Sequence, residues 1–357
     1  MNLLHVVAQL DPGGAERIVV QLATDAIELG DAVVVASGGG LWVKQVRAVG
    51  AGHETVALGR RSIPATLGAA ARLAVVARRF RPDVVHAHNV RATAAVAPAL
   101  LGLRPRPALI TTLHVVAPAD YPSAARTLRV AGGTVVACVP AVGRALVDAG
   151  FPASRMDVIT NGAALPPALP AERAAVRTRF ALDRRPLVVG IGRLVAQKAW
   201  STLLAAAEGF EPSEVIVAGD GPLKADLEAA AAVRGGRVRF IGRVENPQAL
   251  ISLAACVVST SIWEGLPLSI LEALALGAPV VATAVDGVAD LIPPEAALLV
   301  PPGDPGAVTA AVNRILTEPG LARRLSRAAR RAGRGWTPEA MLARYRERYA
   351  AALDSTR

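Results

Sequence analysis

VVSTSIWEGLPLSILEALALGAPVVAT (residues 257–283) holds one complete unit of the pattern that predicts the fold. The β-branched run 257–260 predicts a strand, and Pro267 suits the first position of a helix. That helix ends at the Gly-Ala-Pro break of 277–279, and 280–283 predicts a second strand. Two short apolar strands joined by a helix are typical of a buried parallel sheet.

The same stretch is long enough to be considered as a membrane span. Residues 266–285 carry only one charge, that of Glu272, and about twenty apolar residues can cross a bilayer. Pro267 and the break at 277–279 interrupt this run, so a buried helix followed by a strand is the better interpretation.

The alternation of strands and helices continues along the 357 residues, which fit two domains of ordinary size. The strands expected in the first half are 3–10, 32–37, 54–58, 83–88, 108–114, 134–139 and 157–160. Those in the second half are 187–191, 215–218, 238–241, 257–260, 280–283 and 298–300. Helices are expected at 15–29, 64–79, 142–149, 323–333 and 338–353, among others.

The stretch 163–170 (AALPPALP) reads as a linker between the two series. The sequence therefore predicts an α/β protein with two Rossmann-like, doubly wound parallel-sheet domains, 1–163 and 164–335. A final helix, 336–357, is expected to return to the first domain.

Cysteine usage and the N-terminal sequence both suggest a cytoplasmic protein. Cys138 and Cys256 lie in apolar runs without metal-ligand spacing, as core thiols in a reducing compartment do. The opening residues reach a turn before the apolar region of a signal peptide could form.

The net charge of +10 favours anionic partners. Nucleic acid is not expected, because aromatic residues make up only 3% and no binding motif is present. Arginines of the first half could face an anionic acceptor or the inner surface of a membrane, with a solvated helix end as the alternative. They are Arg60, Arg61, Arg72, Arg78, Arg79 and Arg81.

Two loops are candidates for binding phosphate. Gly13 and Gly14 follow the first strand, where glycine permits positive φ and close approach to a ligand, although an empty tight turn has the same pattern. Arg193 and Lys198 follow the first strand of the second half. Two cations at one sheet edge can hold a diphosphate and stabilise it as a leaving group; a solvated loop is the alternative.

Two glutamates give the most specific signal. Glu264 lies in a loop and Glu272 in the second turn of the predicted helix, between hydrophobic residues that argue against a solvated face. Between them, Gly265, Leu266, Pro267 and Leu268 lead into the helix, where exposed N–H groups can bind phosphate. A carboxylate for sugar hydroxyls, amides for phosphate and a carboxylate for a ribose diol together suit a sugar diphosphate.

This segment resembles the E-x7-E motif of the retaining glycosyltransferases of family 4, which have the GT-B fold. Residues 13–17 are similar to the family's N-terminal glycine turn, 192–198 to its Gly-Arg…Lys segment and 158–162 to its interdomain turn. Residues 219–222 and 240–244 are similar to its middle strands. The resemblance covers nearly the whole chain.

The resemblance implies a role for each candidate residue. Arg193 and Lys198 would bind the donor diphosphate, Glu272 the ribose and Glu264 the donor sugar. Gly14 would approach the β-phosphate, and His114 matches the active-site histidine. Lys198 is followed by Ala199 and Trp200 where the family usually has glycine, which puts the flexibility of that loop in question.

No metal or cofactor is expected. His86 and His88 share a strand face, but no cysteine or carboxylate completes a set, and no Asp-x-Asp motif occurs in a suitable loop. His5 and His86 are expected to be core histidines, and His88 is expected to line a cleft. The resemblance implies a front-face retaining transfer of a hexose from a UDP- or GDP-sugar. The acceptor would be a cell-envelope or lipid-linked glycan, or a small molecule.

Other functions remain open on the sequence. A sugar-nucleotide epimerase can share the fold, and a transferase that has lost its catalytic activity could bind sugar nucleotides without turnover. A dinucleotide-dependent oxidoreductase would need G-x-G-x-x-G after the first strand, and a pyridoxal-phosphate phosphorylase would need a buried lysine. The chain has only three lysines, Lys44, Lys198 and Lys224.

Overall fold

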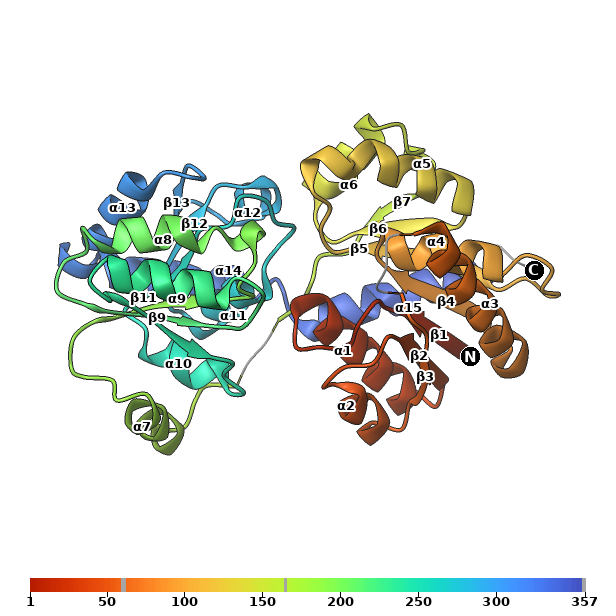
Figure 1. Cartoon of the computed structure of the whole chain (residues 1–357), viewed down its shortest axis with the longest axis horizontal. Helices are drawn as coiled ribbons and strands as arrows, with labels where there is room; N and C mark the ends of the chain where they lie inside the picture. Colours follow the sequence, from red (N-terminus) through yellow and green to blue (C-terminus); the bar gives the residue numbers. More distant parts are fainter. Residues whose placement is uncertain (59–61, 164–165, 355–357) are drawn as a thin grey trace. The chain divides into compact units, whose positions relative to one another are not determined.

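A computed structural model describes residues 1–58, 62–163 and 166–354. The chain forms two compact units, one of Met1–Asn161 with Pro338–Arg357 and one of Gly162–Thr337. Each unit contains one sheet of parallel strands with helices packed on it (Figure 1). The predicted fold class, two Rossmann-like parallel-sheet domains, is confirmed.

The first unit has a seven-stranded sheet in the order β3-β2-β1-β4-β5-β6-β7. Its strands are β1 (Asn2–Val6), β2 (Ala32–Ser37), β3 (Gly52–Thr55), β4 (Val84–His88), β5 (Ala108–Leu113), β6 (Thr134–Ala137) and β7 (Met156–Val158). Its helices are α1 (Gly14–Glu28), α2 (Val43–Ala48), α3 (Ile63–Phe80), α4 (Val90–Ala99), α5 (Tyr121–Ala131), α6 (Pro140–Asp148) and α15 (Pro338–Asp354), with 3-10 turns at Pro118–Asp120 and Ala153–Arg155.

The second unit has a six-stranded sheet in the order β10-β9-β8-β11-β12-β13. Its strands are β8 (Leu187–Ile191), β9 (Glu214–Ala218), β10 (Val238–Gly242), β11 (Cys256–Ser259), β12 (Val280–Thr283) and β13 (Leu298–Val300). Its helices are α7 (Pro170–Arg179), α8 (Trp200–Ala207), α9 (Lys224–Val233), α10 (Pro247–Leu253), α11 (Leu268–Leu276), α12 (Asp286–Leu291), α13 (Pro305–Thr317) and α14 (Leu321–Gly333), with a 3-10 turn at Ala196–Lys198.

The strand order reverses once in each sheet, and these two places matter for function. In the first unit the reversal lies between β1 and β4, and in the second between β8 and β11. Loops that leave neighbouring strands in opposite directions open a crevice at the carboxyl ends of such strands, where open α/β sheets bind ligands.

The apolar window 266–285 lies inside the second unit as a helix and a strand. Helix α11 and strand β12 occupy it, and Val280 and Val281 are fully buried in the sheet. Within the described ranges, no helix combines the length and the hydropathy that crossing a bilayer requires. The interpretation as a buried helix–strand unit is confirmed.

Helix α15 belongs to the first unit although the whole second unit precedes it in the chain. It packs on α1, β4 and β5, and its buried residues are Met341, Tyr345, Tyr349 and Ala352. The guanidinium of Arg346 forms an ion pair with the carboxylate of Asp25 on α1. The last described helix of the chain therefore completes the core of the first unit.

The basic surface expected in the first half is described in part. Arg72, Arg78 and Arg79 lie on α3 and Arg81 caps its C-terminus, and all four are exposed. Arg60 and Arg61 lie outside the described residues. Glu54 lies within 4 Å of two of these arginines, Arg72 at 3.9 Å and Arg79 at 3.8 Å, so part of the positive charge is offset.

Candidate functional site

Two loops of the second unit meet at the point where the sheet order reverses. The loop after β8 carries Lys198 and the loop after β11 carries Glu264, and the Lys198 ammonium forms an ion pair with Oε1 of Glu264. Their side chains are only 14% and 9% exposed. Ser261 donates a second hydrogen bond, 3.0 Å long, to the same carboxylate oxygen. An ammonium and a carboxylate thus lie side by side at the edge where ligands bind.

Further hydrogen bonds tie the two loops together behind this pair. The side-chain amide of Gln197 donates to the carbonyl of Trp263 at 3.0 Å, and the carbonyl of Gln197 accepts from the N–H of Ile262 at 3.0 Å. The Thr260 hydroxyl donates to the carbonyl of Lys198 at 2.9 Å. The backbone around both charged groups is therefore fixed before any ligand arrives.

Ser261, Gln197 and Thr260 are not among the site residues predicted from the sequence. Gln197 directly precedes Lys198, and Ser261 lies three residues before Glu264. Their nearness in sequence to the two charged residues was the one feature that could have suggested a place in the site. That signal does not say which polar neighbours face inward, because this depends on how the two loops meet.

Glycines let the loop after β8 pack closely on its neighbours. A Cβ on Gly190 would lie 2.6 Å from the ring of Trp200, and a Cβ on Gly219 would lie 1.8 Å from the carbonyl oxygen of Gly192. The indole N–H of Trp200 donates to the carbonyl of Arg193 at 2.9 Å. The Arg193 side chain itself is exposed at the end of β8, where an anion can reach it.

Ala199 shows how the chain accommodates its departure from the family pattern. Its φ of 44° and ψ of 46° lie in the left-handed region, which glycine adopts at no steric cost and alanine does not. The loop therefore keeps the backbone shape that glycine would favour, and alanine holds that shape at a cost in strain.

Glu272 lies on α11, in its second turn, and is only 3% exposed. Pro267 is the N-cap residue of this helix, so the helix begins one residue later than the sequence analysis expected. Leu268 is the first helical residue, and the N–H groups of a first helical turn have no intrahelical partner. The predicted series of a loop carboxylate, a helix N-terminus and a second, deeper carboxylate is present.

Gly13 and Gly14 lie in the first unit, and their conformations differ from the expectation. Strand β1 ends at Val6, so a longer loop leads to the glycines. Gly13 is extended, with a φ of −166°, and Gly14 begins α1, so neither needs positive φ. The nearest atoms to a Cβ on Gly13 would be those of the movable Glu16 carboxylate, so the space around Gly13 does not require glycine either.

His114 follows β5 directly and is partly buried. Burial lowers its pKa to about 4, so its imidazole is neutral at pH 7. Its Nε2 lies 3.3 Å from Nδ1 of His88, and the two rings are stacked with their centroids 5.6 Å apart. His88 was expected to line a cleft, but it is fully buried beneath neighbours that include His114.

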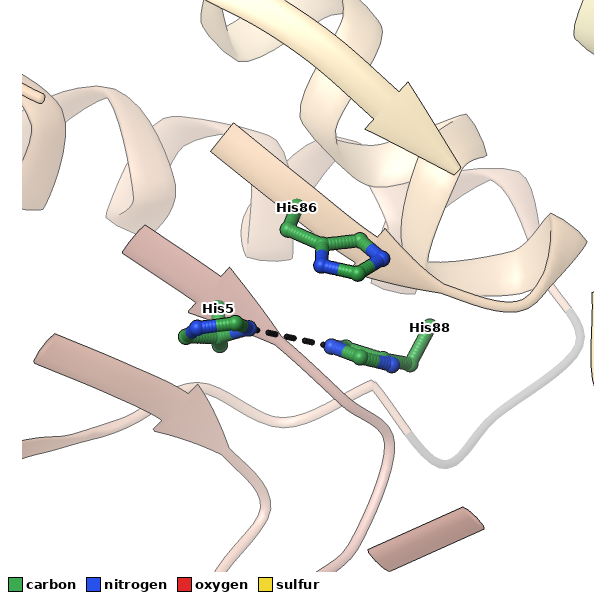
Figure 2. A group of neighbouring side chains, drawn as sticks. All are labelled: His5, His86 and His88. Atoms are coloured by element: carbon green, nitrogen blue, oxygen red, sulfur yellow. Dashed lines mark hydrogen bonds between the residues drawn. The ribbon is translucent and has the colours of Figure 1, made fainter. Parts of the chain in front are cut away.

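His5 joins His86 and His88 in one cluster, which the sequence analysis did not foresee (Figure 2). One ring nitrogen of each lies within 4.8 Å of the others, as a metal site would require. The nitrogens of His86 are already occupied, however: Nδ1 lies 2.8 Å from the hydroxyl of Tyr349 and Nε2 2.7 Å from that of Thr112.

The arrangement of the rings also favours hydrogen bonding over metal binding. The rings of His86 and His88 pack against each other at a tilt of 30° with centroids 4.1 Å apart, whereas metal ligands direct ring edges at a common point. Burial holds the pKa of both histidines well below the usual value, so both are neutral. The cluster is best described as a neutral, hydrogen-bonded part of the core.

The candidate residues thus form two groups. The second unit holds Arg193, Lys198, Gly265, Leu266, Pro267, Leu268, Glu264 and Glu272 at the carboxyl edge of its sheet or on α11. The first unit holds Gly13, Gly14 and His114.

Both halves of the chain match known protein-family models. Residues 12–165 match the model described as Glycosyltransferase Family 4, and residues 185–318 match that of Glycosyl transferases group 1. The second match includes all the candidate residues of the second unit.

Similar proteins occur in several organisms. The lipopolysaccharide core biosynthesis glycosyltransferase LpsD of Rhizobium meliloti is 28% identical over 91% of both chains. The alpha-D-kanosaminyltransferase of Streptomyces kanamyceticus is 35% identical over 44% of this chain, a match that spans only 43% of the relative.

Solved structures share the fold. Anabaena HepE, crystallised in complex with UDP and glucose, superposes with a TM-score of 0.87 at 20% identity and covers 98% of this chain and 100% of its own. WaaG, a glycosyltransferase involved in lipopolysaccharide biosynthesis, superposes with a TM-score of 0.74 at 16% identity, covering 93% and 95%.

Proposed function

Since the chain is a glycosyltransferase of the GT-B type, we propose that it moves a hexose from a UDP- or GDP-sugar to an acceptor, with retention and without a metal ion. The observation that supports this most directly is the Lys198–Glu264 pair at the sheet reversal of the second unit. Anabaena HepE, a solved structure of the same fold, has been crystallised with UDP and glucose and with UDP-glucose.

The donor diphosphate would replace part of the Lys198–Glu264 pairing. Lys198 and the exposed Arg193 follow the same strand, and both can donate to phosphate oxygens. The N-terminal amides of α11 add a third source of positive potential. Charge on the diphosphate grows as its bond to the sugar breaks, so these fixed donors stabilise the transition state more than the bound substrate.

The two glutamates would hold different parts of the donor. Glu264 accepts hydrogen bonds from Lys198 and Ser261, which leaves room on its carboxylate for a sugar hydroxyl. Its negative charge also suits a sugar ring that becomes positive as the bond to phosphate stretches. Glu272, deeper and nearly covered, would accept from the two hydroxyls of the ribose.

Two residues of the first unit would contribute as well. Gly14 at the start of α1 allows backbone to approach the β-phosphate. His114, neutral at pH 7, would offer a hydrogen bond and not a charge to the donor sugar.

Retention would follow a front-face path. The bond from the anomeric carbon to the phosphate oxygen breaks while the acceptor oxygen bonds to the same face of that carbon. The acceptor proton passes to the departing phosphate oxygen, so the products are a glycoside and a nucleoside diphosphate. This path needs no protein nucleophile.

The acceptor would be a cell-envelope or lipid-linked glycan, or a small molecule. The similar proteins include a lipopolysaccharide core biosynthesis glycosyltransferase and a 2-deoxystreptamine glucosyltransferase, names that suit both kinds of acceptor. The exposed arginines on α3 favour an anionic acceptor or one presented at an anionic membrane surface.

A thermal-shift panel of nucleotide sugars, with and without EDTA, tests the donor assignment. A donor at about 100 times its Kd should stabilise the protein by about 2.7 kcal/mol. Transfer to a panel of acceptors, with the anomer of the product read by NMR, then tests retention. Loss of binding and transfer in EDTA would overturn the metal-free site. Conversion of the nucleotide sugar without an acceptor would instead show an epimerase.

A further inference from the structure

Three imidazoles form a continuous line through the first unit. Nδ1 of His5 lies 3.1 Å from Nε2 of His88, and Nδ1 of His88 lies 3.3 Å from Nε2 of His114. Figure 2 shows the link between His5 and His88 as a dashed line. The line runs from the buried interior of the sheet to the residue that follows β5.

The strand order explains why these residues meet. His5 lies on β1, His88 ends β4 and His114 follows β5, and these three strands are adjacent in the sheet. His5 and His88 are fully buried. Burial lowers the pKa of all three histidines, so each ring is neutral at pH 7.

A neutral imidazole has one N–H and one bare nitrogen. Along a line of such rings the protons must therefore follow one order. Either His5 donates to His88 and His88 to His114, which puts the proton of His114 on Nδ1, or all donations run the other way and leave Nδ1 bare. One ring cannot change its tautomer unless the other two change with it.

The outer end of the line is a single nitrogen. Nδ1 of His114 is buried and has no hydrogen-bond partner among the described residues, and the same holds for Nε2 of His5 at the inner end. A sugar hydroxyl can both donate and accept, so it would satisfy the His114 nitrogen in either proton order. The proton order along the three rings decides whether the hydroxyl donates to this nitrogen or accepts from it.

We infer that His88, supported by His5, is a positioning residue that fixes the tautomer and ring plane of His114. This rests on the proposed function, in which His114 contacts the donor sugar. Fixing the ring in advance means that no proton has to be rearranged when the substrate binds, and pre-organised polar groups of this kind contribute to transition-state stabilisation.

The remaining histidine of the core provides a matched control. His86 is as deeply buried as His88 and lies on the same strand, but its nitrogens bond to Tyr349 and Thr112. It stands outside the line of donors and acceptors that ends at His114. A variant of His86 therefore reports the general cost of disturbing this core.

Two variants of His88 separate its two contacts. The amide of His88→Asn lies near the position of Nδ1 and keeps the contact with His114, whereas that of His88→Gln lies near Nε2 and keeps the contact with His5. The ¹⁵N signals of labelled imidazoles distinguish protonated from bare nitrogens and give the tautomer of His114 in the free protein. His86→Gln is the control.

In His88→Gln we expect His114 to show a mixture of tautomers and kcat to fall about tenfold, with little change in donor KM. In His86→Gln we expect the single tautomer to persist, and in His88→Asn, which loses the link to His5, we expect the same mixture as in His5→Phe. If the His88 variants do not fold, His5→Phe breaks the inner link while keeping the ring shape, and His114 should again become a mixture.

A single unchanged tautomer in His88→Gln or His5→Phe would overturn the inference, as would an equal mixture in His86→Gln. The NMR measurement needs no sugar donor. It therefore tests the role of His88 even if the protein proves not to transfer the proposed sugar. Failure of sugar transfer alone would contradict the proposed function and not the role of His88.

Discussion

Glu264 accepts hydrogen bonds from both Lys198 and Ser261, and so joins the loop after β8 to the loop after β11 across 66 residues of sequence. The two groups assigned to the sugar and to the diphosphate are thus each other's partners in the free protein. A donor that binds here exchanges one ion pair for contacts with its own hydroxyls and phosphates.

Loss of either member of this pair should lower kcat more than it raises donor KM. In Lys198→Ala the leaving diphosphate loses a cation, and in Glu264→Ala the ring loses a carboxylate, and both effects are larger in the transition state. We expect kcat to fall roughly 100- to 1000-fold, measured by steady-state kinetics. The exposed pair of Lys224 and Glu228 is the control, since Lys224→Ala should leave kcat unchanged.

Glu272→Ala should behave differently. Its proposed partner, the ribose, is held equally in the bound donor and in the transition state, so uniform binding is lost. Donor KM should rise roughly 10- to 100-fold, given about 1.5–3 kcal/mol for hydrogen bonds to a charged group. An intact kcat in Glu264→Ala together with a destroyed kcat in Glu272→Ala would reverse the two roles.

Ala199→Gly should stabilise the second unit by about 1 kcal/mol, because glycine adopts the left-handed φ without steric cost. Urea unfolding measures the change. Ala181→Gly is the control: that residue also has a positive φ, of 47°, and lies between α7 and β8, outside the two loops that carry Lys198 and Glu264. Both variants should be stabilised, and only Ala199→Gly should change donor KM. Destabilisation by Ala199→Gly would show that the strain is not local.

Removing residues from Thr337 onward should give an unstable or inactive protein, because α15 supplies Tyr345 and Tyr349 to the core of the first unit. Tyr349→Phe keeps the ring and removes only the bond to His86, so it should cost about 1 kcal/mol. Melting temperatures compare the three proteins. Full activity of the truncated chain at an unchanged melting temperature would contradict this.

Acid should destabilise the first unit selectively. All five histidines lie in it, and burial lowers the pKa of His5 and His114 from 6.5 to about 4. Above pH 6.5 neither the folded nor the unfolded form binds these protons. As the pH falls from 6.5 towards 4, only the unfolded chain gains them, and each such histidine removes up to roughly 3 kcal/mol of stability.

Calorimetry between pH 4.5 and 7.5 should show the transition of the first unit moving to lower temperature as the pH falls. The second unit, which has no histidine, is the internal control. His5→Gln removes one titrating group and should flatten the dependence. Equal shifts of both transitions would point to another cause.

Much of the fold could be predicted because its signals are local. Apolar runs bounded by turn residues gave strands such as Ala32–Ser37, Leu187–Ile191 and Val280–Thr283 with the bounds they have in the structure. Strand ends were less certain: β1 ends at Val6 instead of residue 10, because the apolar residues that follow are buried in a loop.

The spacing of Glu264 and Glu272 is also local, and it indicated a loop carboxylate followed by one on a helix. Sequence alone therefore determined the fold class, the order of the elements and the residue types at the candidate site.

Tertiary structure decided which residues meet. Lys198 pairs with Glu264, His5 with His88 and Tyr349 with His86 over separations of 66, 83 and 263 residues. These contacts exist because the sheet places β8 beside β11 and β1 beside β4, and because α15 packs on β4. The period of side chains along a strand says which residues are buried but not which strand lies next to it, so no pattern in the sequence carried these pairs.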